Sequence, residues 1–165
     1  MGVNLVIVVA LILLNGLFAL AELAVVSSRR ARLQALADRN RRGAQSALAL
    51  HADPGRFLPS VQIGITLVGV LTGAVSGATL GVRAGSALVA LGVPYGLAQT
   101  LGVFLVVAAI TALSVIIGEL VPKQIAMSNP EGIAARVAPS MRMVARIGTP
   151  LVWLLDTTAR LVLRL

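Results

Sequence analysis

The stretch LAQTLGVFLVVAAITALSVIIGELVPK, residues 97–123, decides the fold class. From residue 97 to residue 117 it contains no charged side chain, and a helix of about 20 apolar residues is long enough to cross a lipid bilayer. Two more runs of this kind lie upstream. We therefore expect an all-α membrane protein, a single transmembrane domain over residues 1–165 with three transmembrane helices at about residues 3–27, 59–81 and 97–118.

The composition supports the same fold class. Hydrophobic residues make up 58% of the 165-residue chain and charged residues only 12%, whereas a soluble domain carries about a quarter charged residues. This excludes an ordinary soluble fold and a disordered chain. Cysteine is absent, which excludes disulfides, thiolate metal sites and cysteine nucleophiles. His51 is the one histidine, so a histidine-based zinc site is not expected.

The positive charges are unevenly distributed along the chain. Of the 14 Lys and Arg residues, seven lie between the first and second apolar runs, six follow the third, and Arg83 alone lies between the second and third. Basic residues prefer the cytoplasmic side of a membrane, so we expect the N-terminus outside and the C-terminus in the cytoplasm. Nucleic-acid binding is not expected, because almost no aromatic residues alternate with the arginines.

Helices that lie on the membrane surface are expected beside the spans. Residues 28–52 combine an apolar stripe with many arginines, which predicts a juxtamembrane amphipathic helix against anionic headgroups. The NPE sequence at 129–131 is typical of a helix start and predicts a second juxtamembrane helix over residues 130–163. The Gly, Thr and Pro at 148–150 predict an interruption of this helix. Residues 84–93 are apolar but too few to span, and they predict a hairpin or an interfacial piece.

The second apolar run carries small and polar residues at helical spacing. Gly69, Gly73, Gly77 and Gly81 recur every four residues, a pattern that lets another helix backbone approach closely. We expect this stripe to serve helix packing, or to be a sliding or dimer contact in a transport cycle. Gln62 and Thr66 lie one turn apart near the start of the run, where an amide and a hydroxyl can supply oxygen ligands. The threonine can equally bond the backbone of its own helix.

Two acidic residues lie near the ends of apolar runs, Glu22 late in the first and Glu119 after the third. A carboxylate in a membrane needs a partner, which is either a divalent cation shared by both acids or a nearby arginine for each. Glu119 belongs to the segment GELVPK. Pro122 lacks an N–H and frees the backbone around Gly118 from the helical ladder, so a carbonyl there can face a cation. The alternative is a helix that ends at Pro122, with Glu119 and Lys123 as a solvated pair.

Several segments together resemble one protein family. They are NGLF at residues 15–18, AELAVVS at 21–27, RRARL at 29–33, QIGITL at 62–67 and GELVPK at 118–123. In this order they are similar to the transmembrane domain of the CNNM/CorC family of magnesium transport proteins, and the likeness covers nearly the whole chain. The resemblance implies a homodimer of three-span subunits in the bacterial plasma (inner) membrane that exports Mg²⁺, with Na⁺ as a candidate coupling ion.

The resemblance also implies that two ATP-binding CBS modules and a small C-terminal domain follow the membrane domain in whole family members. These 165 residues lack them, so we expect nucleotide regulation to reside elsewhere. A Mg²⁺-sensing membrane scaffold that regulates another transporter is the alternative function. An enzyme is not expected, because no constellation of nucleophile, base and orienting group is present.

Mg²⁺ takes about six oxygen ligands and dehydrates reluctantly. The hypothesis is a Mg²⁺ site near the cytoplasmic side of the three-helix bundle, with a set of ligands comprising Glu119, Ser27, Gln62, Thr66, the carbonyl of Gly118 and Glu22. Glu22 and Ser27 lie about 140° apart around an ideal helix, so both join only if the helix end unwinds. Pro122 and Lys123 are assigned, with the glycine stripe, to packing or gating.

Overall fold

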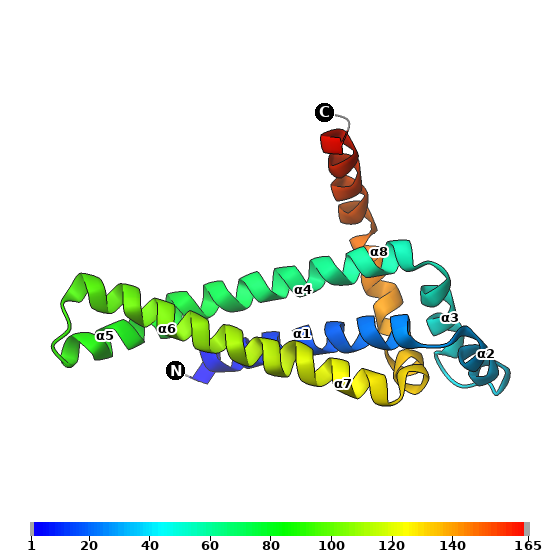
Figure 1. The fold of residues 1–165 in the computed structure, drawn as a ribbon, viewed down its shortest axis with the longest axis horizontal. Helices are drawn as coiled ribbons and strands as arrows, with labels where there is room; N and C mark the ends of the chain where they lie inside the picture. The colour runs from blue at the N-terminus through cyan, green and yellow to red at the C-terminus, as the bar shows by residue number, and fades with distance from the viewer. Residues whose placement is uncertain (1, 164–165) are drawn as a thin grey trace. The chain divides into compact units, whose positions relative to one another are not determined.

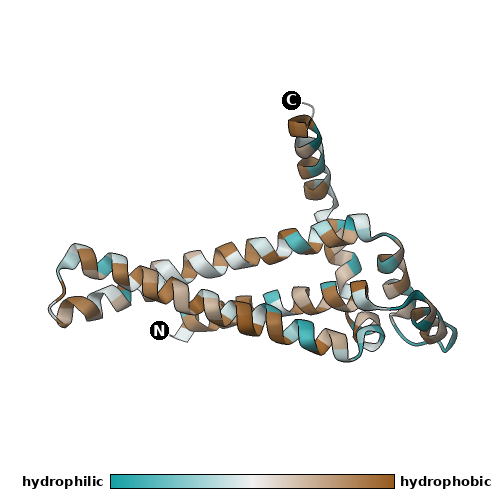
Figure 2. Ribbon diagram, in the orientation of Figure 1, coloured by the Kyte–Doolittle hydropathy of each residue, from teal (hydrophilic) through white to brown (hydrophobic). Residues whose placement is uncertain are grey.

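The computed structural model describes residues 2–163, and within them every regular element is a helix (Figure 1). Three helices are long and apolar enough to cross a membrane, namely Gly2–Ser27, Pro54–Ala90 and Tyr95–Ser128. Hydrophobic residues dominate these helices (Figure 2). The all-α class and the three spans are therefore confirmed, while the bounds of the second and third spans differ from those predicted.

The helices group into two compact units. Unit 1 comprises residues 2–17 and 65–122, and unit 2 comprises residues 18–64 and 123–163. The first helix, α1 (Gly2–Ser27), contributes to both units. Each unit is described by itself below.

The second span is longer than predicted. It consists of α4 (Pro54–Ser76), a wider π-helical turn η1 (Gly77–Gly81) and α5 (Val82–Ala90). Residues 84–93, predicted as a hairpin or an interfacial piece, do not form an element apart from the span, because the helix continues to Ala90. The chain reverses only afterwards, where Gly92 adopts a φ of +92°, a value that suits glycine because it has no Cβ.

Glycines bring α5 close to α6 (Tyr95–Val115) within unit 1. A Cβ on Gly102 would collide with the backbone of Gly85, and a Cβ on Gly81 would lie 2.8 Å from the Cα of Val103. The predicted stripe behaves differently along its length. A Cβ on Gly77 would lie 3.3 Å from the Val107 side chain, whereas nothing lies within 4 Å of a Cβ placed on either of the two earlier members, Gly69 and Gly73. Close packing within unit 1 thus involves the last two members of the stripe, Gly77 and Gly81, and continues to Gly85.

The third span also continues past its predicted end at residue 118. After α6 comes a second π-helical turn, η2 (Ile116–Leu120), followed directly by α7 (Val121–Ser128). Pro122, which lacks the N–H that a regular α-helix would bond to the Gly118 carbonyl, is accommodated directly after this wider turn. The alternative in which the helix simply ends at Pro122 is wrong.

In unit 2 the predicted single helix over 28–52 is two helices, α2 (Arg30–Asp38) and α3 (Ala44–Ala52). Asn40 and Gly43 between them adopt positive φ values of 54° and 79°, which no helix accommodates. A Cβ on Gly43 would collide with the carbonyl oxygen of Ala135 in α8 (Pro130–Leu163). Only glycine permits this approach, so the break is built into the packing of α3 against α8.

The start of α8 agrees with the prediction. The Asn129 side chain caps the helix by accepting a hydrogen bond from the N–H of Gly132 (3.1 Å). Glu131 is buried, accepts a hydrogen bond from the Arg29 N–H (3.1 Å) and lies 3.9 Å from the Arg32 guanidinium. The predicted interruption of the helix at 148–150 is wrong, because α8 continues through Pro150 to Leu163.

Candidate functional site

The turn that contains Glu119 has an altered hydrogen-bond ladder. The N–H of Val121 bonds to the carbonyl of Ile116, five residues earlier, as in a π-helix. Pro122 has no N–H to offer to the carbonyl of Gly118, four residues earlier. Single π-helical turns inside α-helices occur frequently at functional sites.

The Gly118 carbonyl accepts a hydrogen bond from a side chain of α1. The Asn15 Nδ2 donates a hydrogen bond to the Gly118 oxygen at 3.2 Å, and both residues are buried. The next residue, Gly16, allows this approach, because a Cβ there would lie 3.1 Å from the Pro122 ring and 3.3 Å from the Ile117 oxygen. The dipeptide Asn15–Gly16 therefore fastens α1 to the wide turn of unit 1.

The second polar atom of the Asn15 side chain is its oxygen, Oδ1. This oxygen is buried and has no hydrogen-bond partner among the residues that the structure describes. A buried amide oxygen without a donor is costly and rare in native proteins. It needs a donor or a cation, so Asn15 is a candidate ligand that the sequence-based set omitted. The signal was available, since an amide in the middle of an apolar span is itself expensive.

Unit 1 also holds three of the predicted ligands. Glu119 is half-buried in the same turn as the buried Gly118, and Thr66 is exposed on α4. Asn15 and Gly118 thus meet at this turn, and Glu119 is the next residue of the chain after Gly118.

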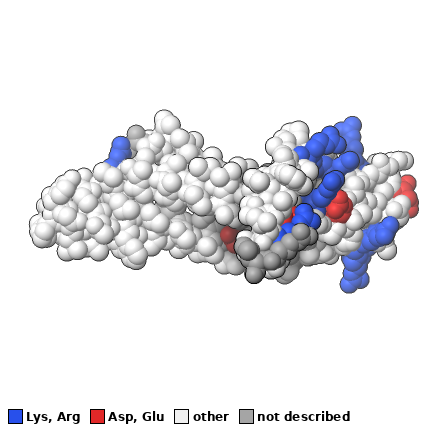
Figure 3. Space-filling view, turned by 90° about the horizontal axis from the view of Figure 1, so that it is seen from above, with Lys and Arg blue, Asp and Glu red and all other residues white. Residues whose placement is uncertain are grey.

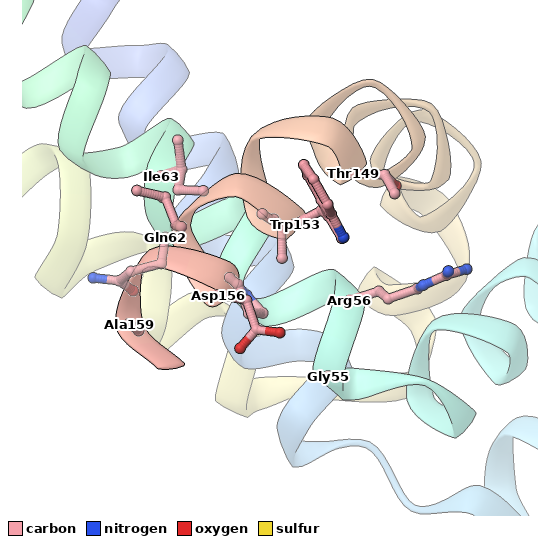
Figure 4. A pocket seen from close by; sticks show the side chains of 11 residues that line it. Gly55, Arg56, Gln62, Ile63, Thr149, Trp153, Asp156 and Ala159 are labelled. Carbon is pink, nitrogen blue, oxygen red and sulfur yellow. The ribbon is translucent and has the colours of Figure 1, made fainter. Parts of the chain in front are cut away.

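The remaining predicted ligands belong to unit 2. On α1, Glu22 is half-buried and Ser27 is exposed. The buried serine is Ser28, whose hydroxyl donates to the Val25 carbonyl at 2.7 Å. Gln62 is exposed on α4 and lines a groove against α8 together with Trp153 and Asp156 (Figure 4). Each unit therefore contains a part of the predicted ligand set.

Acidic and histidine side chains do not cluster in the described residues. Within 2–163 no group of three or more His, Asp or Glu side chains lies close enough to hold a metal ion. His51 instead places its Nδ1 3.1 Å from the Val25 carbonyl. A metal bound by this chain would depend mainly on hydroxyl, amide and carbonyl oxygens, which suit hard cations such as Mg²⁺ rather than zinc or copper.

Comparison with known proteins gives the family. Residues 6–165 match the model of the CNNM family, described as the cyclin M transmembrane N-terminal domain. The chain belongs to the CNNM family. This agrees with the resemblance seen in the sequence motifs and covers the wide turn, Asn15 and every predicted ligand.

Relatives of this CNNM domain include UPF0053 proteins and polyamine export proteins. UPF0053 protein sll0260 from Synechocystis is 51% identical over 157 residues, which is 94% of this chain and 35% of that protein. The polyamine export protein of Haemophilus influenzae is 32% identical over 158 residues (96% of this chain, 36% of that protein), and that of Escherichia coli K12 is 30% identical over 162 residues (98% and 36%). The chain spans about a third of the length of these relatives.

Proposed function

We propose that this CNNM domain exports Mg²⁺ across the membrane, with Glu119 as the charged ligand. The observation that carries the proposal is the wide turn of unit 1. There Glu119 directly follows Gly118, whose proline-released carbonyl accepts a hydrogen bond from Asn15, and the Asn15 Oδ1 is buried with no partner among the described residues.

The chemistry of the turn suits a hard cation. A carbonyl oxygen has two lone pairs, so the Gly118 oxygen keeps one after accepting the Asn15 bond. Mg²⁺ needs about six oxygens and commonly retains several waters. The proposal adds Asn15 to the ligands predicted from the sequence, which are Ser27, Gln62, Thr66, Gly118, Glu119 and Glu22. One firm carboxylate ligand implies moderate affinity, which allows the ion to be released.

The names of two relatives favour a second candidate cargo. Both are called polyamine export proteins, and a polyamine is an organic cation that a carboxylate and neutral oxygens can also bind. Unit 1 contains only one acidic residue, Glu119, so it offers a single ion-pairing group for a molecule with several ammonium groups. We therefore place Mg²⁺ first and polyamines second.

The proposal includes a homodimer in the plasma membrane, anionic lipid around its basic helices, and the N-terminus outside with the C-terminus in the cytoplasm. Exchange against Na⁺ is the proposed coupling. A Mg²⁺-sensing scaffold is the competing role, and it differs from a transporter because the purified protein alone would carry no flux.

The test is ion flux through purified protein in liposomes loaded with a Mg²⁺-sensitive dye. We expect Mg²⁺ flux in the wild-type protein and its loss in Glu119→Gln, because the amide keeps the shape but not the charge. Asp38→Asn is the matched control, since Asp38 is an exposed carboxylate bonded to Gln34 in α2. Normal Mg²⁺ transport by Glu119→Gln would refute the assignment.

Further measurements on the same protein distinguish Mg²⁺ export from polyamine export and from Mg²⁺ sensing. Spermidine flux that depends on Glu119, without Mg²⁺ flux, would replace the cargo by a polyamine. Protection against thermal unfolding by millimolar Mg²⁺, without flux of either cation, would identify the sensor instead, because a ligand that binds only the folded state raises the melting temperature. Imposed Na⁺ gradients test the coupling ion.

A further inference from the structure

Three arginines of unit 2 line one small cavity. Arg56 lies in the first turn of α4, and Arg142 and Arg146 lie one turn apart on α8. The cavity has a volume of about 250 Å³, and its wall also includes Asp53 and Thr149. The lining carries three positive charges and one negative charge. We call the three arginines the arginine cluster. On the face that Figure 3 displays, most of the visible Lys and Arg side chains lie toward one end, while most of the face is uncharged.

The arginine cluster is built to receive an anion. Like charges four residues apart on a helix, as at Arg142 and Arg146, repel each other, and an anion between them would relieve this cost. A guanidinium presents five N–H donors in a planar fork that matches phosphate oxygens. Arg142 donates to the Ser46 hydroxyl at 3.4 Å, so most of its donors remain for a ligand.

An apolar groove adjoins the arginine cluster. It has a volume of about 590 Å³ and shares Arg56 and Thr149 with the basic cavity. Its apolar lining comes from the facing helices α4 and α8 and comprises Pro59, Ile63, Val152, Trp153, Leu155 and Ala159. In Figure 4, Arg56 and Gln62 extend in opposite directions from α4. One end of the groove is therefore basic, and the rest is lined mainly by hydrocarbon.

The acidic residues of the two cavities do not cancel this polarity. Asp156 in the groove forms an ion pair with Arg160 at 2.8 Å. Asp53 in the basic cavity would repel a second anionic group but can accept hydrogen bonds from hydroxyls. A ligand that fits has one phosphodiester charge, a hydroxylated end and a hydrocarbon chain.

We propose that the arginine cluster and the apolar groove form a binding site for an anionic glycerophospholipid of the phosphatidylglycerol type. The phosphate lies among Arg56, Arg142 and Arg146, the headgroup hydroxyls face Asp53, and one acyl chain lies along the groove. Basic pockets between membrane helices are a known way to hold anionic headgroups. The groove shares Gln62 with the proposed Mg²⁺ ligands, but the arginine cluster contains none of them and the site uses no residue of the wide turn.

Trp153 provides the test, because it is the one tryptophan of the chain and it lines the groove. Bromine atoms on an acyl chain quench tryptophan fluorescence on contact. The protein is reconstituted in phosphatidylcholine vesicles that contain a small, equal fraction of brominated phosphatidylglycerol or brominated phosphatidylcholine. We expect stronger quenching by the brominated phosphatidylglycerol, and a loss of about fivefold in its relative association for each arginine of the cluster changed to Gln.

The variants are Arg56→Gln alone and Arg142→Gln with Arg146→Gln, each checked for helix content by circular dichroism. Arg56→Gln, on an exposed side chain, keeps the test valid if the double variant fails to fold. Arg83→Gln is the matched control, since it removes the same charge in unit 1 and should leave the preference unchanged. Equal quenching by the two lipids, or a preference that persists in the cluster variants, would overturn the proposal. Loss of the preference in millimolar inorganic phosphate would identify a site for free anions and would also overturn it.

Discussion

The two units each contain a proline inside a helix, and they treat the carbonyl that it releases in different ways. In unit 1, the Gly118 carbonyl released by Pro122 accepts a hydrogen bond from Asn15. In unit 2, Pro139 follows Ala135 by four residues, and the Ala135 carbonyl faces the backbone of Gly43, where no side chain fits. The Gly118 carbonyl accepts a hydrogen bond from a side chain whose oxygen has no partner among the described residues, whereas the Ala135 carbonyl lies against the Gly43 backbone. A released carbonyl therefore becomes a candidate ligand only where polar side chains accompany it.

The two units also differ in charge. Unit 1 contains one basic residue, Arg83, and one acidic residue, Glu119, whereas the other Lys, Arg, Asp and Glu residues belong to the segments of unit 2. Close glycine contacts hold the helices of unit 1, and a buried ion-paired acid holds those of unit 2. We expect changes of volume to damage unit 1 most and changes of charge to damage unit 2 most.

The largest effect is expected from Gly102→Leu. A side chain at Gly102 would enter the backbone of Gly85, and overpacking of this kind costs about 3 kcal/mol or more. Unfolding in SDS, followed by circular dichroism, should require less detergent, and hydrogen exchange should rise in unit 1. The control is Gly96→Leu on the same helix, where nothing lies within 4 Å of an added Cβ. Equal stability of the two variants would contradict the packing difference.

A smaller effect is expected from Glu131→Ala in unit 2. The change removes a buried acceptor of the Arg29 N–H and the partner of Arg32. Hydrogen bonds to charged groups contribute about 2 kcal/mol. Hydrogen exchange should rise around α2 and the start of α8 and stay unchanged in unit 1. Asp38→Ala, at an exposed acid, serves as the control. An increase of exchange across both units would mean that charge does not act locally here.

The smallest effect on stability is expected from Asn15→Ala. Hydrogen bonds between membrane helices contribute about 1 kcal/mol, and the change also removes the costly unpartnered oxygen. Detergent unfolding should shift little, whereas any protection of the protein by Mg²⁺ should fall clearly. Asn4→Ala, near the start of α1, is the matched change. Unaltered Mg²⁺ protection in Asn15→Ala would remove Asn15 from the proposed ligand set.

The elements of this fold were predictable where one local signal dominates. Apolar length gave the three spans, and the NPE sequence gave the start of α8. The break between α2 and α3 was missed because it depends on the contact of Gly43 with Ala135, which lies far along the chain. The helix past residue 118 was missed because Pro122 indicated an end, whereas a wider turn accommodates it.

The candidate site was predictable only in part for a similar reason. The freed backbone around Gly118 follows from Pro122 alone. The role of Asn15 does not, because it depends on which residue of α1 faces the turn. Likewise, Ser27 and Ser28 are equivalent in a sequence pattern, and only the packing distinguishes the exposed from the buried hydroxyl.

The wide turn at Ile116–Leu120 fixes the angular position of the residues that follow it in unit 1, Val121 and Pro122. A π-helical turn holds one residue more than the bond pattern of an α-helix requires. Removing one residue there would restore a regular helix and rotate the downstream side chains by about 100°. Pro122 would then leave the ring contact with Gly16. The extra residue therefore acts as an angular spacer, and a single deletion at this point should break the hydrogen bond from Asn15 to the Gly118 carbonyl.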